Sequence, residues 1–187
     1  MFGRLRRAAE QLQHLVHETN RLNGNKIWRW GGVWFTDAFW ATASYRLSRS
    51  AYLALGKGWP AVRTVMSPAL YALRPWSGRC EIHYRADIGR GLRVLHPTLG
   101  VVVSGKTVAG ENLLLVGGNC IGSRKTLEQG EIQIGHNVTL GANAVVLGPI
   151  AVGDGVRVGA GAVVVRDVPD GEVVMGPAAV LRGPRAL

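Results

Sequence analysis

The chain has 187 residues, which is enough for one good-sized domain with a smaller segment attached. Its two cysteines are too few for a disulfide framework, and the absence of an uncharged apolar run of 18 residues argues against a membrane-spanning helix. The N-terminal residues lack the apolar core and cleavage site of a signal peptide, so we expect a cytoplasmic protein.

The composition changes near residue 80. All six Trp lie in residues 1–80, and 19 of the 26 Gly lie in residues 81–187. Residues 1–80 contain 12 Lys or Arg against 3 acidic residues, whereas the remainder contains 10 against 9, so most of the net charge of +10 belongs to the first part. We therefore expect a helical, Trp- and Arg-rich segment over residues 1–79 and a separate domain over residues 80–187.

Three helices are expected in the first part. Residues 4–22 suit a basic amphipathic helix, a second runs from Ala38 to Leu55, and a third lies between Pro60 and Arg74. Aromatic side chains mixed with cations suit an anionic membrane surface. The alternative is that the aromatic residues cap the second domain and pack between subunits, with the Arg side chains in solvent. No nucleic-acid-binding module is recognisable.

A period of six residues dominates the second part. One apolar residue recurs every sixth position, at Ile134, Leu140, Val146, Val152, Val158 and Val164. Two positions earlier stands a second apolar or small residue, at Ile132, Val138, Ala144, Ile150, Val156 and Ala162. This period fits neither a helix nor simple strand alternation, and hexapeptide repeats build parallel β-helices. The expected fold class is mainly β, with an α-helical N-terminal segment.

A glycine follows the first apolar position in four of these six hexads. These residues are Gly135, Gly141, Gly153 and Gly159. We expect them to supply the positive φ angle that a tight corner requires.

Upstream, the repeat is interrupted twice. Three extra residues separate Val94 from Val103, and the gap of thirteen between Ile121 and Ile134 is one more than two hexads. Two loops are therefore predicted on a rigid scaffold, and such loops commonly carry function. The first contains His96, a side chain able to take a proton near neutral pH. Glu81 precedes it by fifteen residues, close to one coil, so we expect the carboxylate to lie beneath His96 and to orient the imidazole.

The stretch from Glu81 to Gly183 resembles the serine acetyltransferase family of left-handed β-helix acyltransferases. The resemblance rests on EIHYRADIGRGLRVLHPTLG, on IQIGHNVTLGANAVVLGPIAVGDGVRVGAGAVVVRDVP and on GPAAVLRG, with Tyr45-Arg46-Leu47 similar to an element of the helical front. It implies a homotrimer, or a dimer of trimers, with active sites between adjacent β-helices and acetyl-CoA as the donor. It also implies that His96 is the general base and that Glu81, where the family usually has Asp, pairs with it.

Two departures bear on the acceptor. The family usually has Asp directly before the base, where this chain has Leu95, and the family's second active-site His is missing from the shortened later loop. Both point away from free serine and toward a hydroxyl of another small molecule or a saccharide. Seven residues are expected to bind acetyl-CoA. The backbone N–H of Gly122 is the expected oxyanion donor, and the pantetheine arm is expected to lie along Ala142, Gly159 and Ala160. The CoA phosphates are expected to contact Arg124, Lys125 and Arg166.

Several alternatives stay open at this point. The protein is a serine O-acetyltransferase proper, an N-acetyltransferase of an amino sugar, or a non-catalytic, membrane-associated scaffold trimer. A zinc enzyme on this fold would need three converging histidines, and His83, His96 and His136 lack a close pair, so no metal is expected. A further option is that the N-terminal segment makes peripheral contact with the inner membrane face. We expect no nucleic acid partner.

Overall fold

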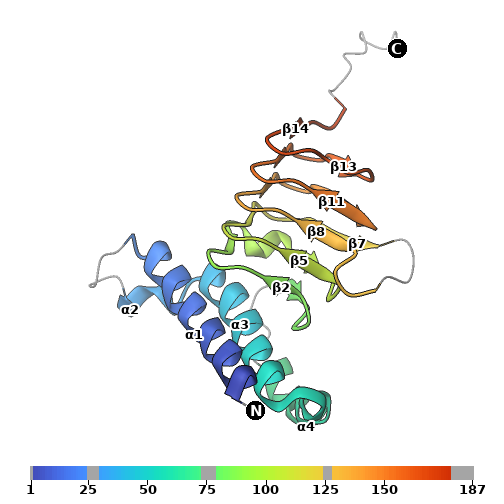
Figure 1. The fold of residues 1–187 in the computed structure, drawn as a ribbon. Coiled ribbons are helices and arrows are strands. Elements are labelled where there is room, and N and C mark those ends of the chain that lie inside the picture. The colour runs from blue at the N-terminus through green and yellow to red at the C-terminus, as the bar shows by residue number, and fades with distance from the viewer. Residues whose placement is uncertain (1, 25–29, 73–78, 124–127, 178–187) are drawn as a thin grey trace, which may run out of the picture.

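The computed structural model describes residues 2–24, 30–72, 79–123 and 128–177, and in it a three-sided parallel β-helix stands on a layer of helices (Figure 1). The three expected helices are present as α1 (Phe2–Leu22), α3 (Asp37–Leu55) and α4 (Trp59–Ala72). Two short elements join them, α2 (Trp30–Val33) and the 3-10 helix η2 (Gly56–Gly58). None of the described helices is both long and apolar enough to cross a bilayer.

The strands form three parallel sheets, one for each side of the prism. Sheet A contains β1 (Cys80–Ile82), β4 (Val101–Val103), β7 (Asn119–Ser123), β10 (Val145–Gly148) and β13 (Val163–Val164). Sheet B contains β2 (Asp87–Ile88), β5 (Thr107–Ala109), β8 (Ile132–Ile134) and β11 (Ile150–Val152). Sheet C contains β3 (Arg93–Val94), β6 (Leu114–Leu115), β9 (Thr139–Leu140), β12 (Arg157–Val158) and β14 (Val173–Val174). The architecture is the parallel β-helix that the repeat predicts, and it matches the left-handed form that the family resemblance implies.

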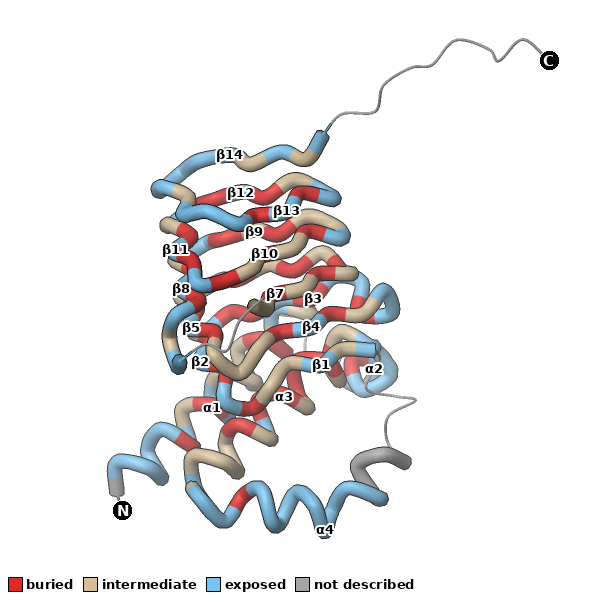
Figure 2. Tube along the Cα trace, turned by 90° about the vertical axis from the view of Figure 1, so that its right-hand side faces the viewer, coloured by how far each residue is buried: buried red, intermediate tan, exposed pale blue. Residues whose placement is uncertain are grey.

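Both apolar sets of the hexads face inward, as predicted. All twelve side chains between Ile132 and Val164 named above are at most 4% exposed, and the tube view shows the buried positions stacked from coil to coil (Figure 2). Upstream, Ile88, Val94, Val103, Leu115 and Ile121 belong to the same core. One continuous apolar column therefore holds the coils together.

The expected role of the hexad glycines is wrong. None of Gly135, Gly141, Gly153 and Gly159 has a positive φ; the positive φ angles fall two residues later, as at Asn143 (57°) and Gly161 (68°). A Cβ at Gly141 would instead lie 2.6 Å from the backbone nitrogen of Ala160 in the next coil. Stacking of the coils at about 4.8 Å leaves no room for a side chain there, and the same close approach of backbones holds at Gly135 and Gly153 but not at Gly159, where the nearest atom is 3.3 Å away.

The two breaks in the repeat differ in size, and the size of the second differs from the prediction. Cys80 pairs with Val101 and Val101 pairs with Asn119, so the first coil has 21 residues where the next has 18, and the three-residue insertion is confirmed. Cys120 pairs with Val145, which makes the third coil 25 residues long. The second break is thus seven residues added to a single hexad rather than one residue added to two.

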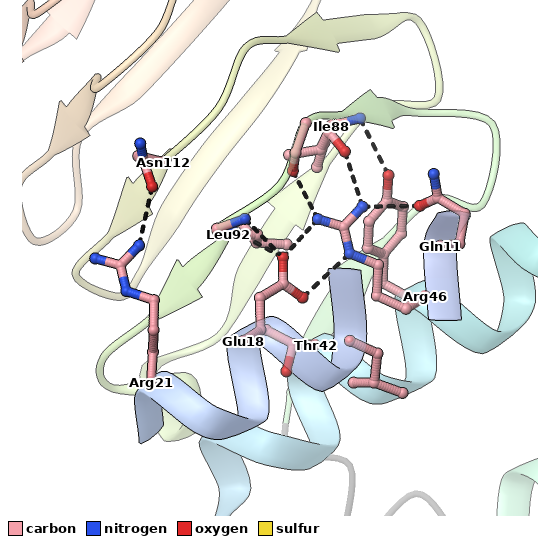
Figure 3. A network of polar contacts seen from close by, with 12 residues as sticks. Gln11, Glu18, Arg21, Thr42, Arg46, Ile88, Leu92 and Asn112 are labelled. Carbon is pink, nitrogen blue, oxygen red and sulfur yellow. Dashed lines mark hydrogen bonds and ion pairs between the residues drawn. The ribbon is translucent and has the colours of Figure 1, made fainter. Parts of the chain in front are cut away.

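A buried ion pair joins the helical layer to the first coil (Figure 3). Arg46 is fully buried; its Nη2 lies 2.6 Å from Glu18 Oε1, and its guanidinium donates to the carbonyl oxygens of Ile88 and Gly89. Glu18 in turn accepts the backbone N–H groups of Gly91 and Leu92. The expectation that the Arg side chains of this segment are solvated is therefore wrong for Arg46, because its charge is paired and fully hydrogen-bonded inside the protein.

Loss of one charge from this pair should be costly. We expect Glu18→Gln to lower the free energy of unfolding by about 3–5 kcal/mol, because it leaves the buried guanidinium of Arg46 without a counter-charge. Arg6→Ala, which breaks the exposed pair with Glu10 at 3.4 Å, is the matched control and should cost less than about 1 kcal/mol. Urea unfolding measures both. Equal losses in the two variants would contradict the structural role of the buried pair.

The correction for the glycines also makes a prediction. Gly141→Ala should lower the free energy of unfolding by about 2–3 kcal/mol, because its Cβ meets rigid backbone. Gly159→Ala occupies the same corner one coil later, where the nearest atom, the Val174 carbonyl oxygen, is 3.3 Å away, and should cost under about 1 kcal/mol. Thermal and urea unfolding of the two variants test this difference; a more damaging Gly159→Ala would refute it.

Candidate functional site

His96 lies in the first coil, at the corner where the chain passes from sheet C to sheet A. It follows β3 and immediately precedes the 3-10 helix η3 (Pro97–Leu99), which fills the three-residue insertion. Its backbone N–H donates to the Val116 carbonyl oxygen at 2.9 Å, and its own carbonyl accepts the N–H of Leu99 at 3.1 Å. Because both bonds and the buried Pro97 fix the backbone, the exposed imidazole is presented to solvent from a rigid loop.

Glu81 lies near the same corner, but not by the predicted stacking. Its partner in the next coil is Val102, because the first coil is longer than three hexads. The corner is instead closed by the Cys80 thiol, which donates to the Pro97 carbonyl oxygen at 3.5 Å. Burial raises the pKa of Cys80 to about 11, so the thiol keeps the proton that makes this bond.

This thiol contact joins the chain neighbours of the two candidate residues. Glu81 directly follows Cys80, and His96 directly precedes Pro97. Both Glu81 and His96 are exposed, and among the described residues no hydrogen bond or ion pair links them. The structure thus brings the two residues to one corner and leaves their carboxylate and imidazole groups unpaired with each other.

A column of small residues rises from His96 along the same corner. It comprises residues 116–118, 141–143 and 159–161, in three successive coils. Backbone bonds keep them in register: the Asn143 N–H donates to the Gly117 carbonyl at 2.8 Å, and the Gly161 N–H donates to the Ala142 carbonyl at 2.9 Å. Three of the residues proposed from sequence for the pantetheine arm therefore share an edge with His96, namely Ala142, Gly159 and Ala160.

The remaining candidates lie at a different corner. Gly122, in β7, and Arg166, just after β13, both stand where sheet A passes to sheet B. Four residues of extended chain separate Gly122 from Gly118 at the His96 corner, a distance of about 13 Å. Arg124 and Lys125 are outside the described residues. Within one chain, the proposed base and the proposed oxyanion donor are thus on opposite sides of sheet A.

The other histidines do not converge with His96. His83 lies at the sheet A to sheet B corner of the first coil, half-buried and stacked on Tyr84 with ring centroids 4.4 Å apart. Burial, with Arg63 and Arg85 nearby, lowers its pKa. His136 lies at the third corner, where its Nδ1 accepts the Glu111 N–H at 3.1 Å. Over the described residues, no group of three His, Cys, Asp or Glu side chains could hold a metal.

Sequence reasoning missed a ladder of side chains at this third corner, between sheets B and C. The His136 N–H donates to Asp154 Oδ1 at 2.6 Å, and the Asp154 N–H donates to Asp170 Oδ1 at 2.8 Å. The acceptors recur two residues after a hexad apolar position, and that spacing was the available signal. A hollow of about 710 Å³ lies beside this ladder over sheet B, away from His96 and its small-residue column. The ladder satisfies corner N–H groups and adds no proton-transfer group near His96.

Comparison with known proteins adds a family context. A family model described as bacterial transferase hexapeptide (six repeats) matches residues 131–166. The curated proteins contain no match.

Among solved structures, the serine acetyltransferase of Neisseria gonorrhoeae is 27% identical with a TM-score of 0.68, and covers 95% of this chain and 67% of its own. A soybean serine acetyltransferase solved with serine is 32% identical with a TM-score of 0.59, and the match covers 76% of this chain and 57% of the soybean chain. A serine acetyltransferase solved with CoA is 26% identical with a TM-score of 0.66, covering 90% and 67%. This chain thus spans about two thirds, or less, of the length of these enzymes.

Proposed function

The chain belongs to the serine acetyltransferase-like family of hexapeptide-repeat acyltransferases, and on that premise we propose that it transfers an acetyl group from acetyl-CoA to a hydroxyl of a small molecule or saccharide, with His96 as the general base. The observation that carries the proposal is the position of His96. It is an exposed imidazole next to a rigid three-residue insertion, at the foot of a column of mostly small residues along which we place the pantetheine arm. Similar structures contain CoA in one case and serine in another.

The chemistry requires one proton acceptor that later becomes a donor. His96 takes the proton of the acceptor hydroxyl while the oxygen attacks the thioester carbonyl. The tetrahedral intermediate then expels the CoA thiolate, which receives the same proton from the imidazolium, and the acetyl ester is released. Backbone N–H groups stabilise the oxyanion, with that of Gly122 as the candidate. Glu81 lies near the same corner without a hydrogen bond to His96, and its proposed role is to offset the positive charge that forms on the imidazole.

The separation of the two corners supports a homotrimer with shared active sites. On the outer face of sheet A, Val102, Cys120, Val145 and Val163 stand in register, one above another. Val102 is 48% and Val163 56% exposed, so this apolar ladder lacks a partner within the described chain. When sheet A packs against a neighbouring copy, the His96 corner of one chain meets the Gly122 corner of the next, which completes the site.

Removal of the proposed base is the direct test. In an assay of CoA release with serine, amino sugars and oligosaccharides as acceptors, His96→Ala should lower the rate with the best acceptor by about 10²–10⁴-fold, the usual contribution of a general base. His136→Ala removes an exposed histidine from a different corner and should stay within about twofold of the wild type. Full activity of His96→Ala would refute the mechanism, and an amine as best acceptor would refute O-transfer.

The shared site makes a second prediction, by subunit complementation. A Cβ at Gly122 would meet only Cys120 Sγ at 3.8 Å, so Gly122→Val should fold while it obstructs the donor side. His96→Ala and Gly122→Val should each be inactive alone. Co-expressed with different tags and purified as mixed trimers, they should recover about a third of wild-type activity, because one of the three shared sites in each mixed trimer then combines two intact halves.

The matched control is the double variant mixed with wild type and purified in the same way, which should retain about a sixth of the sites, because one site is intact in a trimer with two wild-type chains and none in a trimer with one. Complementation that never exceeds the activity of the separate variants would place both residues of each site on one chain and would contradict the shared site.

A further inference from the structure

Among the described residues, no other element covers the outer face of the α1–α3 hairpin. The two helices are antiparallel, because Ser50 bonds to Ala8 while Arg46 bonds to Gln11 and Glu18 further along α1. One face of the hairpin contacts the first coil. The opposite face carries five half-exposed apolar side chains, here called the hairpin patch: Leu5 (49%), Leu12 (44%), Val16 (52%), Leu47 (50%) and Leu55 (52%). An exposed apolar face of this size on a monomeric surface indicates an interaction site.

The charge around the hairpin patch is positive, because two acidic residues of the helical layer already form ion pairs with Arg side chains. Glu18 is buried against Arg46, and Glu10 pairs with Arg6. The Arg4 guanidinium packs on Gly56, next to Leu55 and to the exposed Lys57, at one end of the patch. In the described parts of residues 2–72, the remaining acidic residue is Asp37 at the start of α3, against several cations without an acidic partner. These are Arg4, Arg7, Arg21, Lys57 and Arg63.

We propose that the hairpin patch docks on an anionic lipid surface. An apolar stripe with cations at its rim is the arrangement of helices that lie in the membrane interface. A second copy of the same face is disfavoured, because it would bring two positively charged rims together. Most of helix α4 is exposed in its described part (Figure 2). It adds Val62, Val65 and Met66 at helical spacing, and Phe35, which is 89% exposed and directly precedes α3, adds an aromatic side chain at the other end of the hairpin.

Docking in this orientation would bring the proposed catalytic base close to the lipid. Both η3 and β3, which flank His96, pack against α3, so His96 lies in the coil nearest the helical layer. One helix diameter, about 10 Å, then separates it from the membrane plane. On the premise of the proposed function, acceptors attached to the membrane come within reach of His96 without leaving the surface. In the proposed trimer, the three hairpin patches face the same membrane plane, so their simultaneous binding raises the overall affinity for the lipid surface.

The test uses the full chain and vesicles of defined composition. In co-sedimentation, the protein should bind phosphatidylcholine vesicles containing about 30% phosphatidylglycerol at least tenfold more tightly than pure phosphatidylcholine, and less tightly as salt rises from about 0.1 to 0.5 M. The double variant Leu12→Glu/Leu47→Glu should lose at least about tenfold in binding, and Lys57→Glu about fivefold or more. Arg93→Glu makes the same charge change on sheet C and should bind as wild type. Circular dichroism checks that each variant is folded.

Three results would overturn the docking proposal. The first is equal binding to neutral and anionic vesicles, and the second is a patch variant that binds as well as wild type. The third is an assembly of twice the size in solution that Leu12→Glu/Leu47→Glu disrupts, because that result would assign the hairpin patch to contacts between copies of the chain. CoA release with soluble acceptors is measured in parallel. Vesicle binding without CoA release would reject the proposed function alone, whereas CoA release without vesicle binding would reject the docking alone.

Discussion

The first coil of a β-helix has an open edge, and the pair formed by Arg46 and Glu18 closes it. In the inner coils, backbone groups are paired with the coils on either side. On the free side of the first coil, the carbonyls of Ile88 and Gly89 and the N–H groups of Gly91 and Leu92 have no coil to pair with. Arg46 donates to those carbonyls and Glu18 accepts from those N–H groups, so one ion pair replaces the missing coil at that corner. An uncapped edge would be a site for aggregation.

The buried charges are tolerable because each has several partners. Desolvation of an isolated Arg or Glu is expensive, but here the guanidinium contacts Glu18, Gln11 and two carbonyls, and the carboxylate has two additional N–H donors. Nearby, the Tyr45 hydroxyl donates to the Ala86 carbonyl and accepts the Ile88 N–H. The helical layer therefore fixes the backbone of the coil that also carries the three-residue insertion. A loosened cap would move His96 and Cys80 together, because their corner belongs to that same coil.

The sequence predicts the scaffold well because a six-residue period is a local property. Each apolar position from Ile132 to Val164 could be assigned inward without knowledge of the rest of the chain, and the phase break located His96 in a loop. The role of Gly141 could not be read in this way, because the Ala160 nitrogen that excludes a side chain belongs to the next coil. Burial of Arg46 was hidden for the same reason, since its partner Glu18 lies 28 residues earlier on another helix. The sequence also does not show that Gly122 and His96 occupy opposite edges of sheet A. In the proposed trimer, only contact between two chains brings them together.

On the proposed function, the surroundings of His96 bear on the choice of acceptor. Leu95, 40% exposed, and Leu99, 57% exposed, stand in the same loop, so part of the surface beside the imidazole is apolar. An amino acid acceptor carries an ammonium group, which requires a carboxylate or several carbonyl oxygens once it leaves water. Leu95 offers neither, and it stands where the resembling enzymes usually have an acid. A sugar ring, by contrast, presents apolar C–H faces as well as hydroxyls and can pack on leucine while one hydroxyl reaches the base. The leucines thus favour a saccharide hydroxyl over free serine, and Leu95→Asp is the substitution that should move acceptor preference back toward serine in the CoA-release assay.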